Sequence, residues 1–243
     1  MKETMAQTPI PRQWVPWSLV LGYSGLLAAI AGFVNSVALL VFAFPVSNLT
    51  ALTTQLGMDS ANPLLYESCM IALIMSGFLL GAAGAGATLG GTRTNTGPRH
   101  AAVLLGEAVL LLAATAAGLA GVKVLLAAAA CGLQNGMTSN FRGMAIRTTH
   151  FTGTMTDLGF MLGRGRRHGV DTWKATVLTT TVVLFLGGGA VGAVIGGRFG
   201  DHALILPAAA CLAVAAASLV HARRRNAAAR AIPSSAPANA PSR

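Results

Sequence analysis

The chain has 243 residues, of which 53% are hydrophobic and only 10% are charged, whereas soluble domains carry about 25% charged residues. Its 17 basic and 7 acidic side chains are too few to cover the surface of a water-soluble fold of this size. The composition therefore excludes a soluble enzyme, a disordered chain and a secreted disulfide scaffold, and it predicts an all-α integral membrane protein.

Six apolar stretches are long enough to cross the hydrocarbon core of a bilayer, which takes about 20 helical residues. In chain order they are residues 18–42, 64–90, 101–119, 120–140, 174–197 and 202–221. The first is too long for the core of a signal peptide, so we expect an uncleaved helix. We expect residues 1–17 to be a cytoplasmic segment. Residues 222–243 are rich in Ala, Pro, Ser and Asn, which predicts a disordered cytoplasmic tail after the membrane domain 18–221.

The basic residues predict the orientation of these helices. With both termini in the cytoplasm, all of the 17 Lys and Arg residues except Lys123 and Arg198 fall on the cytoplasmic side, as the positive-inside rule requires. The net charge of +10 is therefore explained by orientation in a membrane, and we expect no binding of nucleic acid.

The two halves of the chain resemble each other. Residues 32–35 (GFVN) match residues 132–135 (GLQN) at an offset of 100, and residues 47–57 match residues 149–159 at an offset of 102. The repeats would extend over about 18–119 and 120–221. Because each holds three helices, the second repeat has inverted topology. This 3+3 arrangement is found in secondary transporters, which bind their solute at the repeat interface.

Glycines at four-residue spacing indicate close helix packing in both repeats. Gly77 and Gly81 lie in the second apolar stretch, together with Gly86 and Gly90; Gly188, Gly192 and Gly196 lie in the fifth. At the offset of 102, Gly86 and Gly90 are matched by Gly188 and Gly192.

In each repeat, a helix that holds an Asn is followed by a hydroxyl-rich segment, at residues 43–57 and 148–164. A broken helix within a membrane must be buried in protein or line a wet cavity. The pattern leaves two alternatives open: the segments re-enter the membrane and bind a solute, or they are surface loops and the asparagines only bond neighbouring helices. For the first alternative, the candidate solute-binding residues are Asn35, Asn48, Thr50, Asn135, His150, Thr152 and Asp157.

Acidic residues within spans are costly and usually face a partner or water, so they are candidates for proton or ion coupling. Asp157 lies in the second hydroxyl-rich segment, and we expect it to carry the proton, with Arg147 as its partner. Glu107 lies six residues into the third stretch. It is either a second coupling residue or a side chain that reaches the membrane interface beside Arg99.

Signatures of metal sites and of enzymes are absent from the sequence. Cys69, Cys131 and Cys211 lie in apolar stretches without C-x-x-C spacing, and the five histidines have no ligand spacing, so we expect no metal and no cofactor. No H-E-x-x-H, nucleophile elbow or P-loop occurs. We therefore expect that the protein is not an enzyme.

The string RTTHFTGTMTDLG at residues 147–159, preceded by GLQN at 132–135, resembles the signature of the YoaK-type bacterial membrane proteins. These are multi-pass proteins that form a family of unknown function, and the resemblance extends over about residues 18–221. It implies a bacterial inner-membrane location and about six helices, and it implies no particular activity. Thr50-Ala51-Leu52 stands where such proteins usually have Thr-Gly-Asn.

These patterns favour a transporter of a small solute or ion with its site at the interface of the inverted repeats. A non-transporting scaffold or regulatory protein is the alternative, because the basic cytoplasmic face suits it equally well. The expected partners are the lipid bilayer and an unidentified small solute or ion. The sequence does not decide between a monomer and a homo-oligomer.

Overall fold

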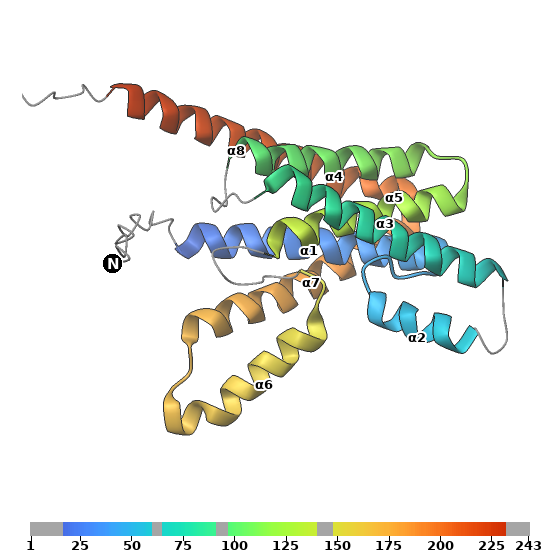
Figure 1. Cartoon of the computed structure of the whole chain (residues 1–243), viewed down its shortest axis with the longest axis horizontal. Coiled ribbons are helices and arrows are strands. Elements are labelled where there is room, and N and C mark those ends of the chain that lie inside the picture. Colours follow the sequence, from blue (N-terminus) through green and yellow to red (C-terminus); the bar gives the residue numbers. More distant parts are fainter. Residues whose placement is uncertain (1–16, 60–64, 91–96, 140–147, 232–243) are drawn as a thin grey trace, which may run out of the picture.

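The computed structural model describes residues 17–59, 65–90, 97–139 and 148–231, and the regular structure in these ranges is helical (Figure 1). The elements in chain order are α1 (Trp17–Phe42), α2 (Leu49–Asp59), α3 (Leu65–Leu89), α4 (Pro98–Ala116), α5 (Ala120–Thr138), α6 (Phe151–His168), α7 (Thr172–Phe199), the 3-10 helix η1 (Gly200–Leu204) and α8 (Ile205–Ala231). The predicted all-α class is confirmed.

Several of these helices are long and apolar enough to cross a membrane. Within the described ranges such stretches are Val20–Phe42, Tyr66–Leu89, Pro98–Ala116 and Thr172–Arg224, the last of which contains α7, η1 and α8. The remaining predicted span, 120–140, corresponds to α5, but Lys123, Gln134 and Asn135 lower its mean hydropathy. The chain is thus a multi-pass membrane protein.

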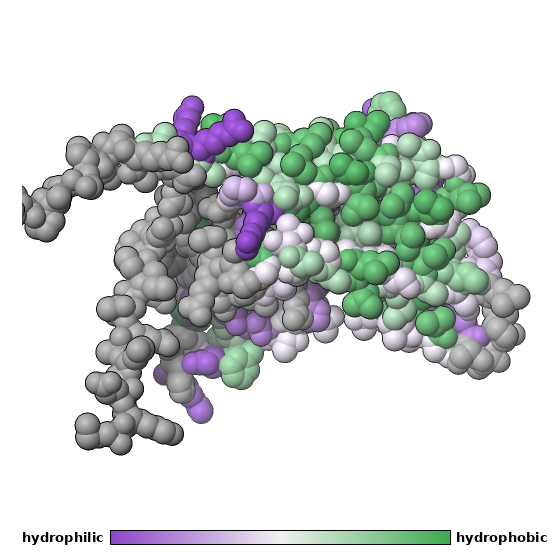
Figure 2. All heavy atoms as spheres, turned by 45° about the horizontal axis from the view of Figure 1, so that its top comes forward, coloured by the Kyte–Doolittle hydropathy of each residue, from purple (hydrophilic) through white to green (hydrophobic). Residues whose placement is uncertain are grey.

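On the face that Figure 2 shows, apolar side chains cover much of the bundle, and hydrophilic residues lie toward its ends. Exposed large hydrophobic residues occur along the long helices, among them Leu79, Leu80, Val109, Leu186 and Val194. Soluble monomers rarely expose continuous apolar surface of this kind. Contact with the lipid bilayer accounts for it.

The C-terminal boundary differs from the sequence prediction. We expected the disordered tail to begin at residue 222, but α8 continues to Ala231. Residues 222–231 contain five alanines and four arginines, both of which have high helix propensity, so the helix extends past the apolar stretch. Residues 232–243, and residues 1–16 of the predicted N-terminal segment, lie outside the described part of the chain.

The most extensive helix contacts run between α1 and α7 and between α3 and α5, and α4 packs against α8 and α5. Glycine makes the α1–α7 contact close. A Cβ atom added at Gly32 would lie 2.1 Å from the carbonyl oxygen of Phe185, and one added at Gly188 would lie 2.0 Å from that of Ala29. Only residues without a side chain fit at these two positions.

The α3–α5 contact is built in the same way. A Cβ atom at Gly132 would lie 2.0 Å from the carbonyl oxygen of Phe78, and one at Gly81 would lie 2.0 Å from that of Ala129. The prediction that glycines serve close packing is confirmed for Gly77, Gly81, Gly188 and Gly192, where an added Cβ would lie within 2.7 Å of a backbone oxygen of the facing helix. It is wrong for Gly86, where an added Cβ would meet nothing within 4 Å, and for Gly90, which follows the end of α3 and has only the Arg99 side chain near it, at 3.8 Å.

The shorter helices α2 and α6 complete the fold. They start close to each other beside the bundle and diverge from there (Figure 1). Along their length, α2 contacts α3 and α6 contacts α7. Their first turns border the same pocket, which is the candidate site.

Candidate functional site

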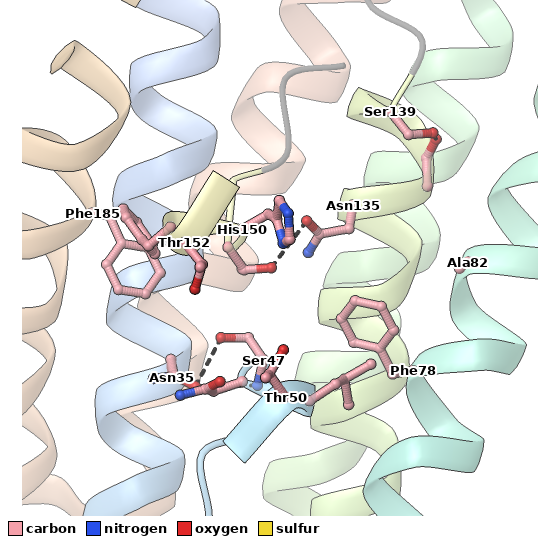
Figure 3. Close-up of a pocket in the computed structure, with 15 residues that line it drawn as sticks. Asn35, Ser47, Thr50, Phe78, Ala82, Asn135, Ser139, His150, Thr152 and Phe185 are labelled. Carbon is pink, nitrogen blue, oxygen red and sulfur yellow. Dashed lines mark hydrogen bonds between the residues drawn. The ribbon is translucent and has the colours of Figure 1, made fainter. Parts of the chain in front are cut away.

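A pocket of about 510 Å³ lies where the first turns of α2 and α6 approach α1 and α5 (Figure 3). Segments from both halves of the chain form its wall. The lining residues are Asn35, Ser47, Asn48, Leu49, Thr50, Phe78, Ala82, Asn135, Gly136, Ser139, Thr149, His150, Phe151, Thr152 and Phe185.

Asn35 on α1 fixes the segment that leads into α2. Its side-chain oxygen accepts two hydrogen bonds from Ser47, one from the backbone N–H at 3.1 Å and one from the hydroxyl at 2.8 Å. Ser47 is buried, so the loss of this acceptor would leave two polar groups without a partner inside the protein. The Asn35 side chain thus determines where α2 begins.

Asn135 on α5 has the same relation to α6. Its side-chain oxygen accepts a hydrogen bond from the Thr149 hydroxyl at 3.1 Å, and its amide group donates to the carbonyl oxygen of Cys131 at 2.9 Å. In both cases the side-chain oxygen of the asparagine holds the loop segment that leads into the next short helix, α2 or α6. The predicted alternative was that the two asparagines only bond neighbouring helices. Their bonds to Ser47 and Thr149 join them to loop segments instead.

The first turns of α2 and α6 lie at the pocket. Asn48 caps α2 with a hydrogen bond of 3.4 Å from the N–H of Ala51 to its side-chain oxygen, whereas His150, at the start of α6, makes no such side-chain bond. The first N–H groups of a helix have no partner within it and carry partial positive charge. Thr50 and Thr152 extend from the same turns into the pocket (Figure 3).

Aromatic rings form the apolar part of the lining. Phe151 and Phe185 contact each other with ring centroids 4.4 Å apart at an interplanar angle of 60°, and Phe78 lies on the α3 side of the pocket. None of the lining residues carries a carboxylate, an ammonium or a guanidinium group. The pocket thus combines neutral hydrogen-bonding groups with apolar surface, which is the composition of a site for a small molecule.

Six of the predicted solute-binding residues line this one pocket: Asn35, Asn48, Thr50, Asn135, His150 and Thr152. The structure thus brings together side chains that are about 100 residues apart in sequence. Their binding of a solute stays a prediction. Sequence reasoning missed Ser47 and Thr149, although both lie in the matched segments, and it had no signal for Phe78 and Phe185.

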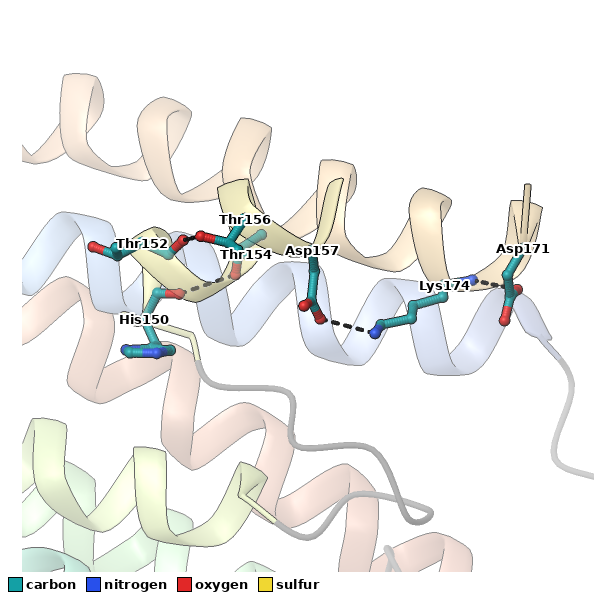
Figure 4. Close-up of polar contacts among 7 residues, drawn as sticks. All are labelled: His150, Thr152, Thr154, Thr156, Asp157, Asp171 and Lys174. Carbon is teal, nitrogen blue, oxygen red and sulfur yellow. Dashed lines mark hydrogen bonds and ion pairs between the residues drawn. The ribbon is translucent and has the colours of Figure 1, made fainter. Parts of the chain in front are cut away.

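Asp157, the seventh predicted residue, lies outside the pocket. It is in the second turn of α6, and its carboxylate pairs with the ammonium group of Lys174 on α7 at 2.8 Å (Figure 4). Both side chains are substantially exposed. The helix begins at Phe151, so a rise of about 1.5 Å per residue carries Asp157 away from the first turn. Arg147, its predicted partner, lies outside the described residues.

Glu107 lies apart from the pocket as well. Its side chain in α4 is 1% exposed, and one carboxyl oxygen, Oε2, is buried without a hydrogen-bond partner. The alternative that it reaches the membrane interface beside Arg99 is therefore wrong. Arg99 instead donates a hydrogen bond to the carbonyl oxygen of Leu89.

Metal binding has no support in the described ranges, where no group of three or more His, Cys, Asp or Glu side chains is arranged to hold an ion. The cysteines in these ranges, Cys69, Cys131 and Cys211, are free thiols.

A family model described as a protein of unknown function (DUF1275) matches residues 24–217, so the chain belongs to this family. The resemblance to the YoaK-type membrane proteins is confirmed. The matched region includes every residue that lines the pocket. Searches of curated proteins and of solved structures gave no match.

Proposed function

We propose that this member of a family without an assigned activity is a transporter of a small polar solute or ion, which binds in the pocket between two inverted repeats. One observation carries the proposal: twelve of the fifteen residues that line the pocket form pairs, one member from each half of the chain. The pairs are Asn35 and Asn135, Ser47 and Thr149, Asn48 and His150, Leu49 and Phe151, Thr50 and Thr152, and Phe78 and Phe185.

Bonding within the lining follows the same pairing. Asn35 accepts from Ser47, and Asn135 accepts from Thr149. The two asparagines are 100 residues apart, and the two hydroxyl residues are 102 apart. A pocket assembled by chance from unrelated helices would not repeat both the residue types and their hydrogen bonds.

The helix crossings support the same pairing. In both crossings a glycine of one helix meets the carbonyl of a phenylalanine: Gly32 meets Phe185, and Gly132 meets Phe78. The reciprocal glycines, Gly188 and Gly81, meet alanine carbonyls. Equivalent residues of α3 and α7 in these contacts are 107 positions apart, as are Gly81 and Gly188. The sequence comparison instead paired Gly86 with Gly188, at an offset of 102.

A third correspondence links the short helices to the long ones. Gln55 on α2 donates a hydrogen bond to Glu67 on α3 at 3.2 Å, and Asp157 on α6 pairs with Lys174 on α7. Gln55 and Asp157 are 102 residues apart, as are Thr50 and Thr152 in the pocket. Glu67 and Lys174 are 107 residues apart, as are Phe78 and Phe185 in the helix crossings. In the proposed transporter, Asp157 therefore supports α6 instead of carrying a proton.

The proposed topology has six crossings, formed by α1, α3, α4, α5, α7 and α8, with both termini in the cytoplasm of a bacterial cell. At the opposite end of the bundle, Lys123 of α5 pairs with Asp201 of η1, which suits the non-cytoplasmic side predicted for Lys123. Inverted repeats related in this way expose a site near the midplane alternately to the two sides.

The lining suggests which solutes fit. The hydroxyls of Thr50 and Thr152, the imidazole of His150 and the N–H groups at the two helix starts would bind a solute that has hydrogen-bond acceptors. The phenylalanine rings would contact its apolar part.

The test is a thermal-unfolding screen of the purified protein in detergent against small solutes and ions. A ligand at about 100 times its dissociation constant adds roughly 2.7 kcal/mol to the free energy of unfolding. Thr50→Val and Thr152→Val remove the pocket hydroxyls at nearly constant shape, and Thr88→Val on α3, outside the lining, is the matched control. We expect solute shifts that both pocket variants weaken and the control retains. Solute shifts that all three variants retain, or no shift from any solute, would contradict the proposal.

A further inference from the structure

Glu107 is a buried acidic residue that does not line the pocket. It lies near the middle of α4, its side chain is 1% exposed, and its Oε2 has no hydrogen-bond partner. A carboxylate charge without a partner at such a place costs several kcal/mol. A bound proton removes the charge, so this site accommodates the neutral acid far better than the anion.

The groups around Glu107 supply no positive charge among the described residues. The thiol of Cys211 on α8 is within hydrogen-bonding reach, and the Cys131 thiol on α5 and the Tyr23 hydroxyl on α1 are within electrostatic range. Lys123, at the start of α5, pairs with Asp201 of η1 instead. On α3, which also touches α4, no titratable group is found to interact with Glu107.

Glu107 is connected to the pocket through one turn of α5. The amide group of Asn135 donates to the backbone carbonyl of Cys131, whose thiol faces the Glu107 side, while the oxygen of Asn135 holds Thr149 at the pocket. The Tyr23 hydroxyl bonds to Met137 Sδ on the same helix at 3.6 Å. A shift of α5 when the pocket fills would therefore also change the surroundings of Glu107.

We propose that Glu107 binds and releases the proton that is exchanged in the transport cycle, an inference that rests on the proposed function. The carboxyl group takes up one proton from one side of the membrane and releases it to the other, without covalent change. Filling of the pocket displaces the Cys131–Asn135 turn, and this displacement gives the buried carboxyl access to water. Transport and proton movement are thereby coupled.

The first test is chemical labelling with dicyclohexylcarbodiimide, an apolar reagent that enters membrane proteins. A protonated carboxyl group adds across its C=N bond, with the acid oxygen bonding to carbon and the proton going to nitrogen, and the adduct rearranges to a stable N-acylurea. In the full-length protein we expect mass spectrometry to find this adduct on Glu107. The reagent reacts only with the protonated acid, so the labelling rate should fall as the pH is raised from about 5 to about 10.

Two variants locate the reaction. Glu107→Gln should lose the adduct, and Asp157→Asn should keep it, because Asp157 is an exposed ion-pair partner. No adduct on Glu107 of the wild-type protein, or a rate that is the same across the whole pH range, would overturn the inference. Both of these outcomes are read from the wild type, so they hold even where Glu107→Gln fails to fold.

The second test concerns coupling and uses the solutes that raise the unfolding temperature in the screen. In the wild type their effect should depend on pH, and in Glu107→Gln it should not. A solute effect that is independent of pH in the wild type overturns the inference and leaves the proposed transporter standing. Labelled Glu107 with no solute effect at all overturns the proposed function.

Discussion

Replacement of Gly132 by Ala tests one of the close helix contacts beside the pocket. The new Cβ atom would lie 2.0 Å from the carbonyl oxygen of Phe78 and 2.7 Å from its carbonyl carbon, well inside van der Waals contact. Both atoms belong to the backbone of α3, so no side-chain rotation relieves the clash and the two helices must separate. Overpacking of this kind costs about 3 kcal/mol at its upper end, and Ala regains about 1 kcal/mol over Gly in helix propensity.

The expected net loss for Gly132→Ala is thus about 2 kcal/mol, which corresponds to a fall of roughly 4–8 °C in unfolding temperature for a chain of this size. Because the separation also moves Phe78, any solute shift found in the screen should weaken. Gly86→Ala is the matched control on α3, since its Cβ would meet nothing within 4 Å and its unfolding temperature should stay equal or rise. Equal unfolding temperatures for the two variants would refute this account of the crossing.

Further predictions concern the contacts that hold α2 and α6. Asn35→Ala removes the acceptor of two bonds from buried Ser47 and should lower the free energy of unfolding by about 2–4 kcal/mol, measured by thermal unfolding. Asp157→Asn breaks an exposed ion pair with Lys174 and should cost less than about 1 kcal/mol; a larger loss would mean that the carboxylate has another role. Single cysteines at Thr50 and Thr152, in a variant without native cysteines, should each react with a membrane-impermeant thiol reagent added to either side, because both line one pocket that opens alternately to the two sides. A scaffold would leave each of them reactive from one side only, or inert.

Much of the fold was predictable because long apolar stretches permit few alternatives in a membrane. The stretches 18–42 and 64–90 agree with α1 and α3 within one residue at each end. The end of α8 was not predictable in the same way. The apolar stretch ends near residue 221, where lipid contact ends, but the Ala and Arg residues that follow continue the helix to Ala231.

The candidate site was predictable only in part, for reasons that particular residues make plain. Asn35 and Asn135 stand out as polar groups in apolar helices, and their hydroxyl-rich neighbours repeat. Phe78 and Phe185 line the pocket solely because glycine crossings bring their helices there, and no local pattern encodes that. Asp157 was misjudged as a pocket residue because the sequence does not tell where α6 begins.

Burial of Glu107 was equally hidden from the sequence. Six residues into an apolar stretch, a carboxyl group can either extend back to the interface or turn into the bundle. The choice depends on which side of α4 faces α5 and α8, and this orientation is set by packing. Cys131 and Cys211, which the sequence places in apolar stretches, lie beside that carboxyl group.

Apart from α4 and α8, which pack against each other, the contacts place the helices in two groups, each drawn from both halves of the chain. One group is α1, α7 and α6, joined by glycine crossings and the Asp157–Lys174 pair; the other is α3, α5 and α2, joined in the same manner. Asn35 belongs to the first group and holds the segment entering α2, while Asn135 belongs to the second and holds the segment entering α6. Both asparagine bonds therefore join one group to the other at the pocket. In the proposed transporter, a displacement of one group against the other opens the pocket, and the asparagine bonds are the contacts about which the groups turn.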